Sequence, residues 1–292
     1  MKLLLPFDGS PAALHAAELL AGYAGDVAQL APRLLNVQTR PLSLWPEGVL
    51  DARAVEAALL DAGRGMLKPA VERLAAAGIA VDAAVRLGRP AEAIAQEALV
   101  YGAEAIVMGT RGHGAMQGFA LGSVALRVAH GNGPPVVLVK PDDRLPGTVG
   151  LRTKVLLAMD GSEPALRAAE RLVAWRGWLG ELDVHLVYVQ EPLTMLQAVL
   201  PPHDDVIGQW STREGEDATR KARELFARGK IAHHLHLTVG DPSREIMVLA
   251  EQTKADLIVV GTRGRGAAHH ALIGSVALKS AALTAVPVLL VP

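Results

Sequence analysis

The sequence predicts an α/β protein made of two tandem doubly wound domains, each with a Rossmann-like five-stranded parallel sheet. Three observations support this prediction. The chain has 292 residues, which is enough for about two domains. Short runs rich in Val, Leu and Ile alternate with longer Ala-rich stretches, a pattern typical of buried parallel strands connected by helices. One glycine-rich motif occurs twice, at Gly109 and at Gly261, 152 residues apart (261 − 109 = 152).

The repeated motif is Gly-x-x-Gly-x9-Gly-Ser, and its offset has the length of a whole domain. Further segments recur at the same offset: 2–10 with 154–162, 36–38 with 188–190, and 135–139 with 287–291. No net insertion separates these anchors. We therefore predict domains at residues 1–143 and 151–292, with a polar linker rich in structure-breaking residues at 141–150.

Each domain is expected to alternate five strands with four helices. The first-domain strands are predicted at 2–6, 33–38, 79–86, 104–108 and 135–139, and the helices at 10–24, 51–77, 89–102 and 122–131. The second-domain strands are predicted at 153–158, 182–189, 231–239, 256–260 and 287–291, and the helices at 162–178, 210–229, 241–253 and 274–284. Ser10 and Ser162 precede Pro and Glu-Pro, so each should cap a helix. The proline-rich segments 39–50 and 190–209 are expected to be irregular and to act as mobile lids.

The bulk properties exclude several classes of protein. Net charge is −1 and aromatic residues make up 3%, without the basic face and stacking platforms typical of nucleic-acid binding. Cysteine is absent, which excludes a disulfide framework and thiolate chemistry. The apolar stretch before Asp8 is too short for a signal peptide, and other apolar runs are too short to span a membrane. We therefore expect a cytoplasmic protein with neither nucleic-acid nor membrane partners.

The two glycine loops should follow the predicted strands 104–108 and 256–260. In open α/β sheets, ligands bind at the carboxyl ends of strands. Glycines there permit positive φ and let backbone N–H groups approach an anion. The Gly-Ser pairs at 122 and 274 then begin a helix, whose N-terminus favours a phosphate group. A purely structural strand-to-helix turn is the alternative, but the doubled motif in one context favours phosphate binding.

The loops, the Asp-Gly-Ser after the first strand of each half and the closing Pro-Val apolar strands together resemble the universal stress protein family, in its tandem two-domain form. The resemblance covers nearly the whole chain. It implies that ATP, with Mg²⁺ as a companion ion, binds between the first and fourth strands of each domain. It also implies that Asp8 and Asp160 contact the nucleoside, and that Val37 and Val189 present backbone groups to the adenine.

The resemblance and the loop chemistry give one set of expected nucleotide-binding residues in each domain. In the first they are Pro6, Phe7, Asp8, Val37, Met108, Gly109, Arg111, Gly112, His113, Gly122, Ser123 and Val124. In the second they are Ala158, Met159, Asp160, Val189, Val260, Gly261, Arg263, Gly264, Arg265, Gly274, Ser275 and Val276. Taken alone, Asp8 and Asp160 are explained equally well by an Asx turn with the following glycine. The repeated loop at the same sheet edge favours ligand binding.

No catalytic or metal site is expected. The loops lack the Gly-Lys-Ser/Thr of P-loop kinases, and the sequence contains neither a nucleophile elbow nor paired catalytic carboxylates. His234 and His236 share one face of a predicted strand, but the sequence does not specify a third ligand. We therefore interpret these histidines as solvated, and we expect at most weak ATP hydrolysis.

The leading hypothesis is an ATP-binding stress-response or regulatory protein, in which nucleotide occupancy changes a surface that an unknown protein partner reads. The alternatives are a slow ATPase or autophosphorylating enzyme, and a scaffold that binds no nucleotide. The closing strands 135–139 and 287–291 are apolar and begin with proline, which predicts intramolecular pairing of the domains or a homodimer. Arg265 stands where the first loop has His113, so ATP is expected to prefer the second domain at neutral pH.

Overall fold

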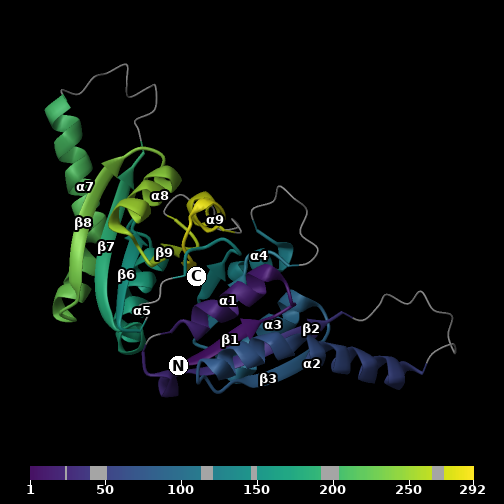
Figure 1. The fold of residues 1–292 in the computed structure, drawn as a ribbon. Helices are drawn as coiled ribbons and strands as arrows, with labels where there is room; N and C mark the ends of the chain where they lie inside the picture. Colours follow the sequence, from purple (N-terminus) through teal and green to yellow (C-terminus); the bar gives the residue numbers. More distant parts are fainter. Residues whose placement is uncertain (24, 40–50, 113–120, 146–149, 192–203, 265–272) are drawn as a thin grey trace. The chain divides into compact units, whose positions relative to one another are not determined.

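The computed structural model describes the chain except for residues 24, 40–50, 113–120, 146–149, 192–203 and 265–272, and it describes only the backbone of 204–211. The chain divides into two compact units, Met1–Gly147 and Thr148–Pro292. The division falls inside the expected linker at 141–150. Each unit is a parallel sheet with helices on both faces (Figure 1).

The first unit alternates strands and helices in the expected order. Its strands are β1 (Lys2–Pro6), β2 (Ala31–Gln38), β3 (Asp82–Leu87), β4 (Ala105–Gly109) and β5 (Val136–Val139). Its helices are α1 (Pro11–Ala21), α2 (Ala52–Ala76), α3 (Pro90–Tyr101) and α4 (Ser123–His130), with a short 3₁₀ turn, η1 (Val27–Gln29). The helices pack in two pairs, α1 with α2 and α3 with α4.

The second unit repeats this plan. Its strands are β6 (Arg152–Ala158), β7 (Glu181–Gln190), β8 (Ala232–Val239), β9 (Leu257–Gly261) and β10 (Val288–Val291). Its helices are α5 (Glu163–Leu179), α7 (Asp204–Arg228), α8 (Pro242–Thr253) and α9 (Ser275–Leu283). Here α5 pairs with α7, and α8 pairs with α9.

Strand order gives both sheets the same switch point. The order is β3-β2-β1-β4-β5 in the first unit and β8-β7-β6-β9-β10 in the second, and all pairs within a unit are parallel. Successive connections leave the first strand in opposite directions, so a crevice opens at the carboxyl ends of β1 and β4, and of β6 and β9. The predicted fold class, two tandem doubly wound five-stranded parallel sheets, is confirmed.

The central strands are buried on both faces, as parallel strands between helix layers must be. In the first sheet, Leu3, Leu4 and Leu5 of β1 are at most 2% exposed, although their side chains point alternately to opposite faces. In the second, Leu156 and Leu157 of β6 are completely buried. These runs carry the apolar cores against which the helices pack, and they fix the strand ends that form the crevice.

One predicted boundary is wrong. The segment 190–209 was expected to be irregular, but α7 begins at Asp204 and continues through Gly208. Glycine lowers helix propensity by only about 1 kcal/mol, and a long helix that packs on a sheet tolerates this cost. The proposed lids at 40–50 and 192–203 lie outside the described residues.

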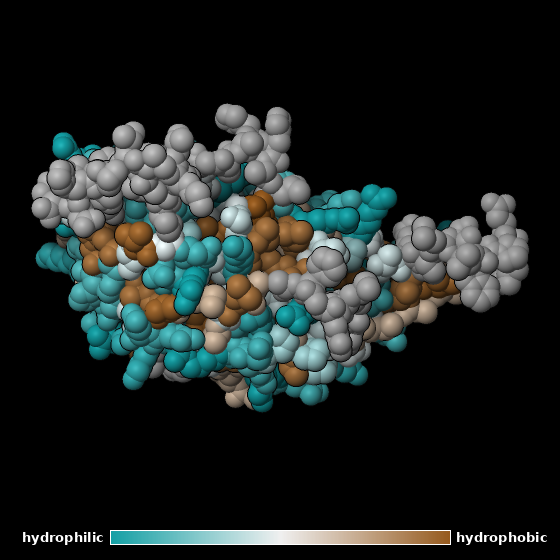
Figure 2. Space-filling view, turned by 90° about the horizontal axis from the view of Figure 1, so that it is seen from above, coloured by the Kyte–Doolittle hydropathy of each residue, from teal (hydrophilic) through white to brown (hydrophobic). Residues whose placement is uncertain are grey.

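The surface is hydrophilic with separate apolar patches on the face shown in Figure 2. Large apolar residues that are strongly exposed include Leu99, Val100 and Leu283, and single exposed residues of this kind are common in folded proteins. Over the described part of the chain, no helix is both long enough and apolar enough to cross a membrane.

Candidate functional site

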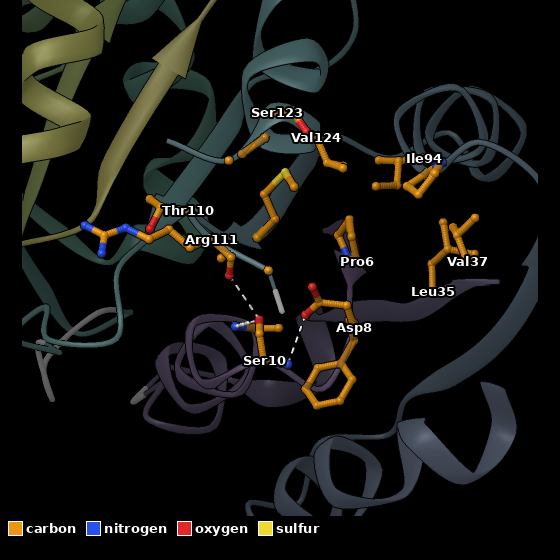
Figure 3. A pocket seen from close by; sticks show the side chains of 18 residues that line it. Pro6, Asp8, Ser10, Leu35, Val37, Ile94, Thr110, Arg111, Ser123 and Val124 are labelled. Atoms are coloured by element: carbon orange, nitrogen blue, oxygen red, sulfur yellow. Dashed lines mark hydrogen bonds between the residues drawn. The ribbon is translucent and has the colours of Figure 1, made fainter. Parts of the chain in front are cut away.

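A cavity of about 390 Å³ opens at the carboxyl ends of β1 and β4. It is lined by every predicted site residue of the first domain that the structure describes, and Figure 3 shows many of them. These residues are Pro6, Phe7, Asp8, Val37, Met108, Gly109, Arg111, Gly112, Gly122, Ser123 and Val124. His113 lies outside the described residues. Elements far apart in sequence thus meet at the switch point.

A second cavity, of about 730 Å³, lies at the equivalent position beside β6 and β9. The predicted residues that line it are Ala158, Met159, Asp160, Val189, Val260, Gly261, Arg263, Gly264, Gly274, Ser275 and Val276. Arg265 lies outside the described residues. Both volumes are within the range of about 300–1,000 Å³ that small-molecule sites occupy.

One side of the first cavity is apolar. Pro6, Val37 and Val124 face it together with Leu35 and Ile94 (Figure 3). Sequence reasoning did not assign Leu35 or Ile94 to the site. For Leu35 a signal existed, because it precedes Val37 by two residues and therefore shares its strand face. These side chains form an apolar surface suited to a flat, weakly polar ring system.

The Asx turns expected at Asp8 and Asp160 are present, and they leave the contact with a nucleoside a prediction. The Ser10 backbone N–H donates to Asp8 Oδ1 at 3.0 Å, which makes an Asx turn, and the Ser162 N–H donates to Asp160 Oδ1 at 2.9 Å. The turn leaves Asp8 exposed at the edge of the cavity it lines. The turn therefore positions the carboxylate rather than competing with a role in binding.

The second glycine of each motif passes close to this carboxylate. A Cβ added to Gly112 would collide with Asp8 Oδ2, and one added to Gly264 would lie 2.8 Å from Asp160 Oδ2. None of the six described motif glycines has a positive φ. These positions therefore do not need the conformational freedom of glycine. They need its missing side chain, because the loop passes very close to its neighbours.

The first glycine of each motif is explained by helix packing. A Cβ on Gly109 would lie 2.7 Å from Ala12 Cβ and from the Ala13 backbone nitrogen, so α1 rests directly on the end of β4. A Cβ on Gly261 would lie 2.8 Å from Pro164 Cβ. Close helix packing therefore explains why Gly109 and Gly261 lack a side chain, as the structural interpretation expected. Both residues also line the cavities.

Ser10 ties the first helix to the glycine loop. Its Oγ accepts from the Ala13 N–H at 3.2 Å as the predicted helix cap, and it donates to the Arg111 carbonyl at 3.1 Å (Figure 3). Ser162 makes the equivalent bonds to Ala165 and Arg263 at 3.4 and 3.3 Å. The caps are confirmed, and their second bond, which fixes the loop, was not foreseen from the sequence.

The helix that follows each loop begins with free N–H groups at the cavity. Gly122 is the N-cap of α4 and Gly274 that of α9, and neither helix has a side-chain cap bond. The first N–H groups of a helix have no partner within it. Ser123, Val124 and Ala125 supply these groups in the first unit, and all three line the cavity. Ser123 is inside the helix and does not cap it.

The arginine side chain at the first cavity is not directed toward Asp8. Figure 3 shows the Arg111 guanidinium directed away from Asp8, while the Arg111 carbonyl faces Ser10. In the second cavity the described lining includes Arg263 and three carboxylates, those of Asp160, Glu191 and Glu214. In the first cavity, the N-terminal N–H groups of α4 therefore line the space, whereas the Arg111 guanidinium is directed away from Asp8.

The fold and the paired cavities define a class of protein, a tandem doubly wound α/β protein with a glycine-loop crevice in each domain. Residues 1–140 and 152–292 each match the universal stress protein family. The chain belongs to this family and contains two copies of its domain.

Relatives agree with this assignment. A universal stress protein of Methanocaldococcus jannaschii is 29% identical over 141 residues, which cover 48% of this chain and 82% of that protein. One from Mycolicibacterium smegmatis is 30% identical over 191 residues, or 65% of this chain and 62% of that protein. The crystal structure of a universal stress protein from Archaeoglobus fulgidus matches 99% of this chain and 95% of its own, with a TM-score of 0.66 and 25% identity.

Proposed function

We propose that each domain binds ATP at its cavity and that the protein is a nucleotide-regulated stress-response protein. In the first site, the apolar surface around Val37 accommodates the adenine, and Asp8 accepts a hydrogen bond from the ribose. The phosphates lie at the N-terminus of α4 and beside the loop at Gly112. The second site repeats this arrangement with Val189, Asp160 and α9.

The observation that carries this proposal is the uncapped start of α4 and of α9. Side chains cap α1, α2, α5 and α8, whereas α4 and α9 begin with glycine and offer free N–H groups at the cavities. Helix α3 also lacks a side-chain cap, but it begins with Pro90, whose nitrogen carries no hydrogen. The free donors lie in the same cavity as a carboxylate and an apolar surface. Donors for an anion, an acceptor for hydroxyl groups and a surface for a flat base are the recognition elements of a nucleotide.

Mg²⁺ would enter with the nucleotide. Among the described lining residues of the first cavity, Asp8 is the one carboxylate, and its Oδ1 already accepts the Ser10 N–H. Mg²⁺ commonly uses substrate phosphates and water as most of its ligands, and this site fits such a role. Among the described residues that line this first cavity, no second carboxylate or imidazole stands ready to activate water, which favours binding over rapid turnover there.

The test measures stoichiometry. The tag-free 292-residue chain, freed of bound nucleotide, should bind two equivalents of ATP in equilibrium dialysis. Gly122→Leu should bind one, because its Cβ would lie 3.1 Å from the Thr110 carbonyl oxygen and the longer side chain would fill the space at the start of α4. Gly133→Leu is the matched control, since a Cβ there meets nothing within 4 Å.

Retention of two equivalents by Gly122→Leu would contradict the assignment of this loop. Absence of ATP binding by the unaltered protein would contradict the function itself and favour the scaffold. Steady phosphate release that Gly122→Leu reduces would instead favour the slow ATPase. Circular dichroism of both variants checks that each has folded.

The relative affinity of the two sites depends on the charges in which they differ. The extra positive charge of Arg265 in the sequence favours the second site, but Arg265 lies outside the described residues. The described lining adds Glu191 and Glu214 to that site, and both oppose a polyanion. We therefore propose that the carboxylates offset the additional arginine and that the first domain holds ATP at least as tightly as the second.

A further inference from the structure

Four polar side chains meet on one face of the second sheet, and none of them lines the nucleotide cavity. They are Asp183 and His185 of β7 and His234 and His236 of β8. The strand register places His185 directly beside His234, with Ala232 beside Asp183 and Val187 beside His236. Residues two apart share a strand face, so all four side chains lie on the same side. This group is called the Asp–His cluster below.

The distances within the Asp–His cluster suit one metal ion. His234 Nε2 lies 3.3 Å from Asp183 Oδ1, and His185 Nε2 lies 3.8 Å from the same oxygen. One ligand atom from each of Asp183, His185 and His234 lies within 4.8 Å of the others. Ligands about 2.0–2.1 Å from a tetrahedral ion are separated by roughly 3.3 Å, so small side-chain adjustments complete the geometry.

We propose that Asp183, His185 and His234 bind a divalent transition-metal ion of the Zn²⁺ type. Two imidazoles and a carboxylate are ligands that Zn²⁺ accepts, with water at the fourth position. The His234 side chain is 58% exposed, whereas those of Asp183 and His185 are 15% exposed. The metal therefore lies at the edge of the sheet, where solvent reaches it through His234.

The Asp183 carboxylate gives a second, independent reason to expect a cation at the Asp–His cluster. Asp183 Oδ1 is buried and accepts no hydrogen bond, although it lies between the two imidazoles. The other oxygen, Oδ2, is 3.7 Å from the Arg152 guanidinium. A buried carboxylate oxygen without a hydrogen bond is costly, and a cation at this position removes the cost.

His236 positions His185. Its Nε2 is 2.9 Å from His185 Nδ1, and the two rings stack at 5.2 Å. When His185 donates its Nδ1 proton to His236, its Nε2 lone pair is directed to the metal, an arrangement common among metal-bound histidines.

The equivalent place in the first domain is filled differently. At the same offset of 152 residues, Arg33 corresponds to His185 and Asp82 to His234. There the Arg33 guanidinium bonds Asp82 at 2.6 Å and Glu97 at 2.8 Å. The fold itself therefore does not require histidines at this face, and one metal ion per chain is expected. The cations Arg152 and Lys154 lie near the cluster, and they moderate the affinity without supplying a ligand.

The test uses the tag-free 292-residue chain after treatment with chelator. One equivalent of Zn²⁺ should bind in calorimetry and should raise the melting temperature. Co²⁺ should bind with the strong visible absorption of four-coordinate geometry. Asp183→Asn and His234→Gln should each weaken Zn²⁺ binding by more than the roughly 10- to 100-fold loss typical of outer partners, and His236→Gln should fall within that range.

His233→Gln is the matched control. His233 lies on the opposite face of β8, near Phe226, and its Nδ1 is 3.0 Å from the Ile231 carbonyl. This variant should bind Zn²⁺ as the unaltered protein does. Failure of the unaltered protein to bind Zn²⁺, equal binding by Asp183→Asn and His234→Gln, or equal loss in His233→Gln would each overturn the proposal. ATP binding is measured in parallel. A lack of ATP binding would contradict the function proposed for the cavities, but it would not contradict the metal site.

Discussion

Replacing Gly109 by alanine tests why the loop contains glycine. The added Cβ would lie 2.7 Å from Ala12 Cβ, from the Ala12 carbonyl carbon and from the Ala13 nitrogen. Carbon atoms in contact prefer about 3.5–4.0 Å, so α1 must move by roughly 0.8 Å or more. Two of these neighbours are backbone atoms, which no change of rotamer can relieve.

The expected cost is about 1–3 kcal/mol, the range typical of overpacking in a close-packed core. Gly261→Ala should cost somewhat less, because its three nearest contacts are longer: Pro164 Cβ at 2.8 Å, the Ala165 nitrogen at 2.9 Å and the Pro164 carbonyl carbon at 3.0 Å. With a urea dependence of about 2 kcal/mol per molar, a loss of about 2 kcal/mol lowers the transition midpoint by roughly 1 M. Midpoints are compared because a two-domain chain need not unfold in one step.

Each unit contains its own control. Gly65 in α2 and Gly177 in α5 are exposed, and a Cβ on either meets nothing within 4 Å. Alanine at these positions should stabilise by up to about 1 kcal/mol, because glycine is a poor helix former. If Gly109→Ala matches or exceeds the stability of the unaltered protein, α1 does not rest on β4 as described, and the role of Gly109 must be sought in the ligand.

Three further predictions follow from the same structure. Ser10→Ala should destabilise the protein by about 1–2 kcal/mol in urea unfolding, since it removes a helix cap and the bond to Arg111. Ser162→Ala, with longer bonds of 3.3 and 3.4 Å, should cost less, and the reverse order would refute this role. Glu214→Gln should raise ATP affinity at the second site by up to about fivefold in calorimetry, because it removes roughly 1 kcal/mol of repulsion in water; unchanged affinity would place this carboxylate too far from the phosphates. In metal-free protein, burial lowers the pKa of His185 and of His236 below the value in the unfolded chain. As pH falls below about 6.5, the unfolded chain therefore binds more protons than the folded protein, and the folded protein loses stability. The urea midpoint should therefore decrease between pH 7.5 and 5.5, and His236→Gln should reduce this decrease.

Local pattern predicted most of the fold and much of the candidate site. The apolar runs of β1 and β6, the caps at Ser10 and Ser162 and the repeat offset are each contained in a few neighbouring residues. The motif glycines could be placed in one cavity because the ends of parallel strands meet at one edge of a sheet. The start of α7 was misplaced, since its first turns include Gly208 and carry a weak local signal.

Other features depended on the tertiary structure. Glu214 of α7 lines the second cavity, and no spacing in the sequence connects it to the loop at Gly264. The packing role of Gly109 needed the position of α1, because the same glycine suits a turn, an anion site or a close helix contact. Local sequence constrains backbone conformation, whereas such contacts join residues from separate elements.

The sequence by itself determined the two-domain repeat, the order of strands and helices and the position of the glycine loops, because periodicity and capping are local properties. Only the tertiary structure decided which distant side chains meet. The Asp–His cluster illustrates this difference: Asp183 and His185 lie about fifty residues before His234, and the register of β7 against β8 brings them together. A shift of one residue in that register would turn the β8 histidines to the other face, and the cluster would not exist.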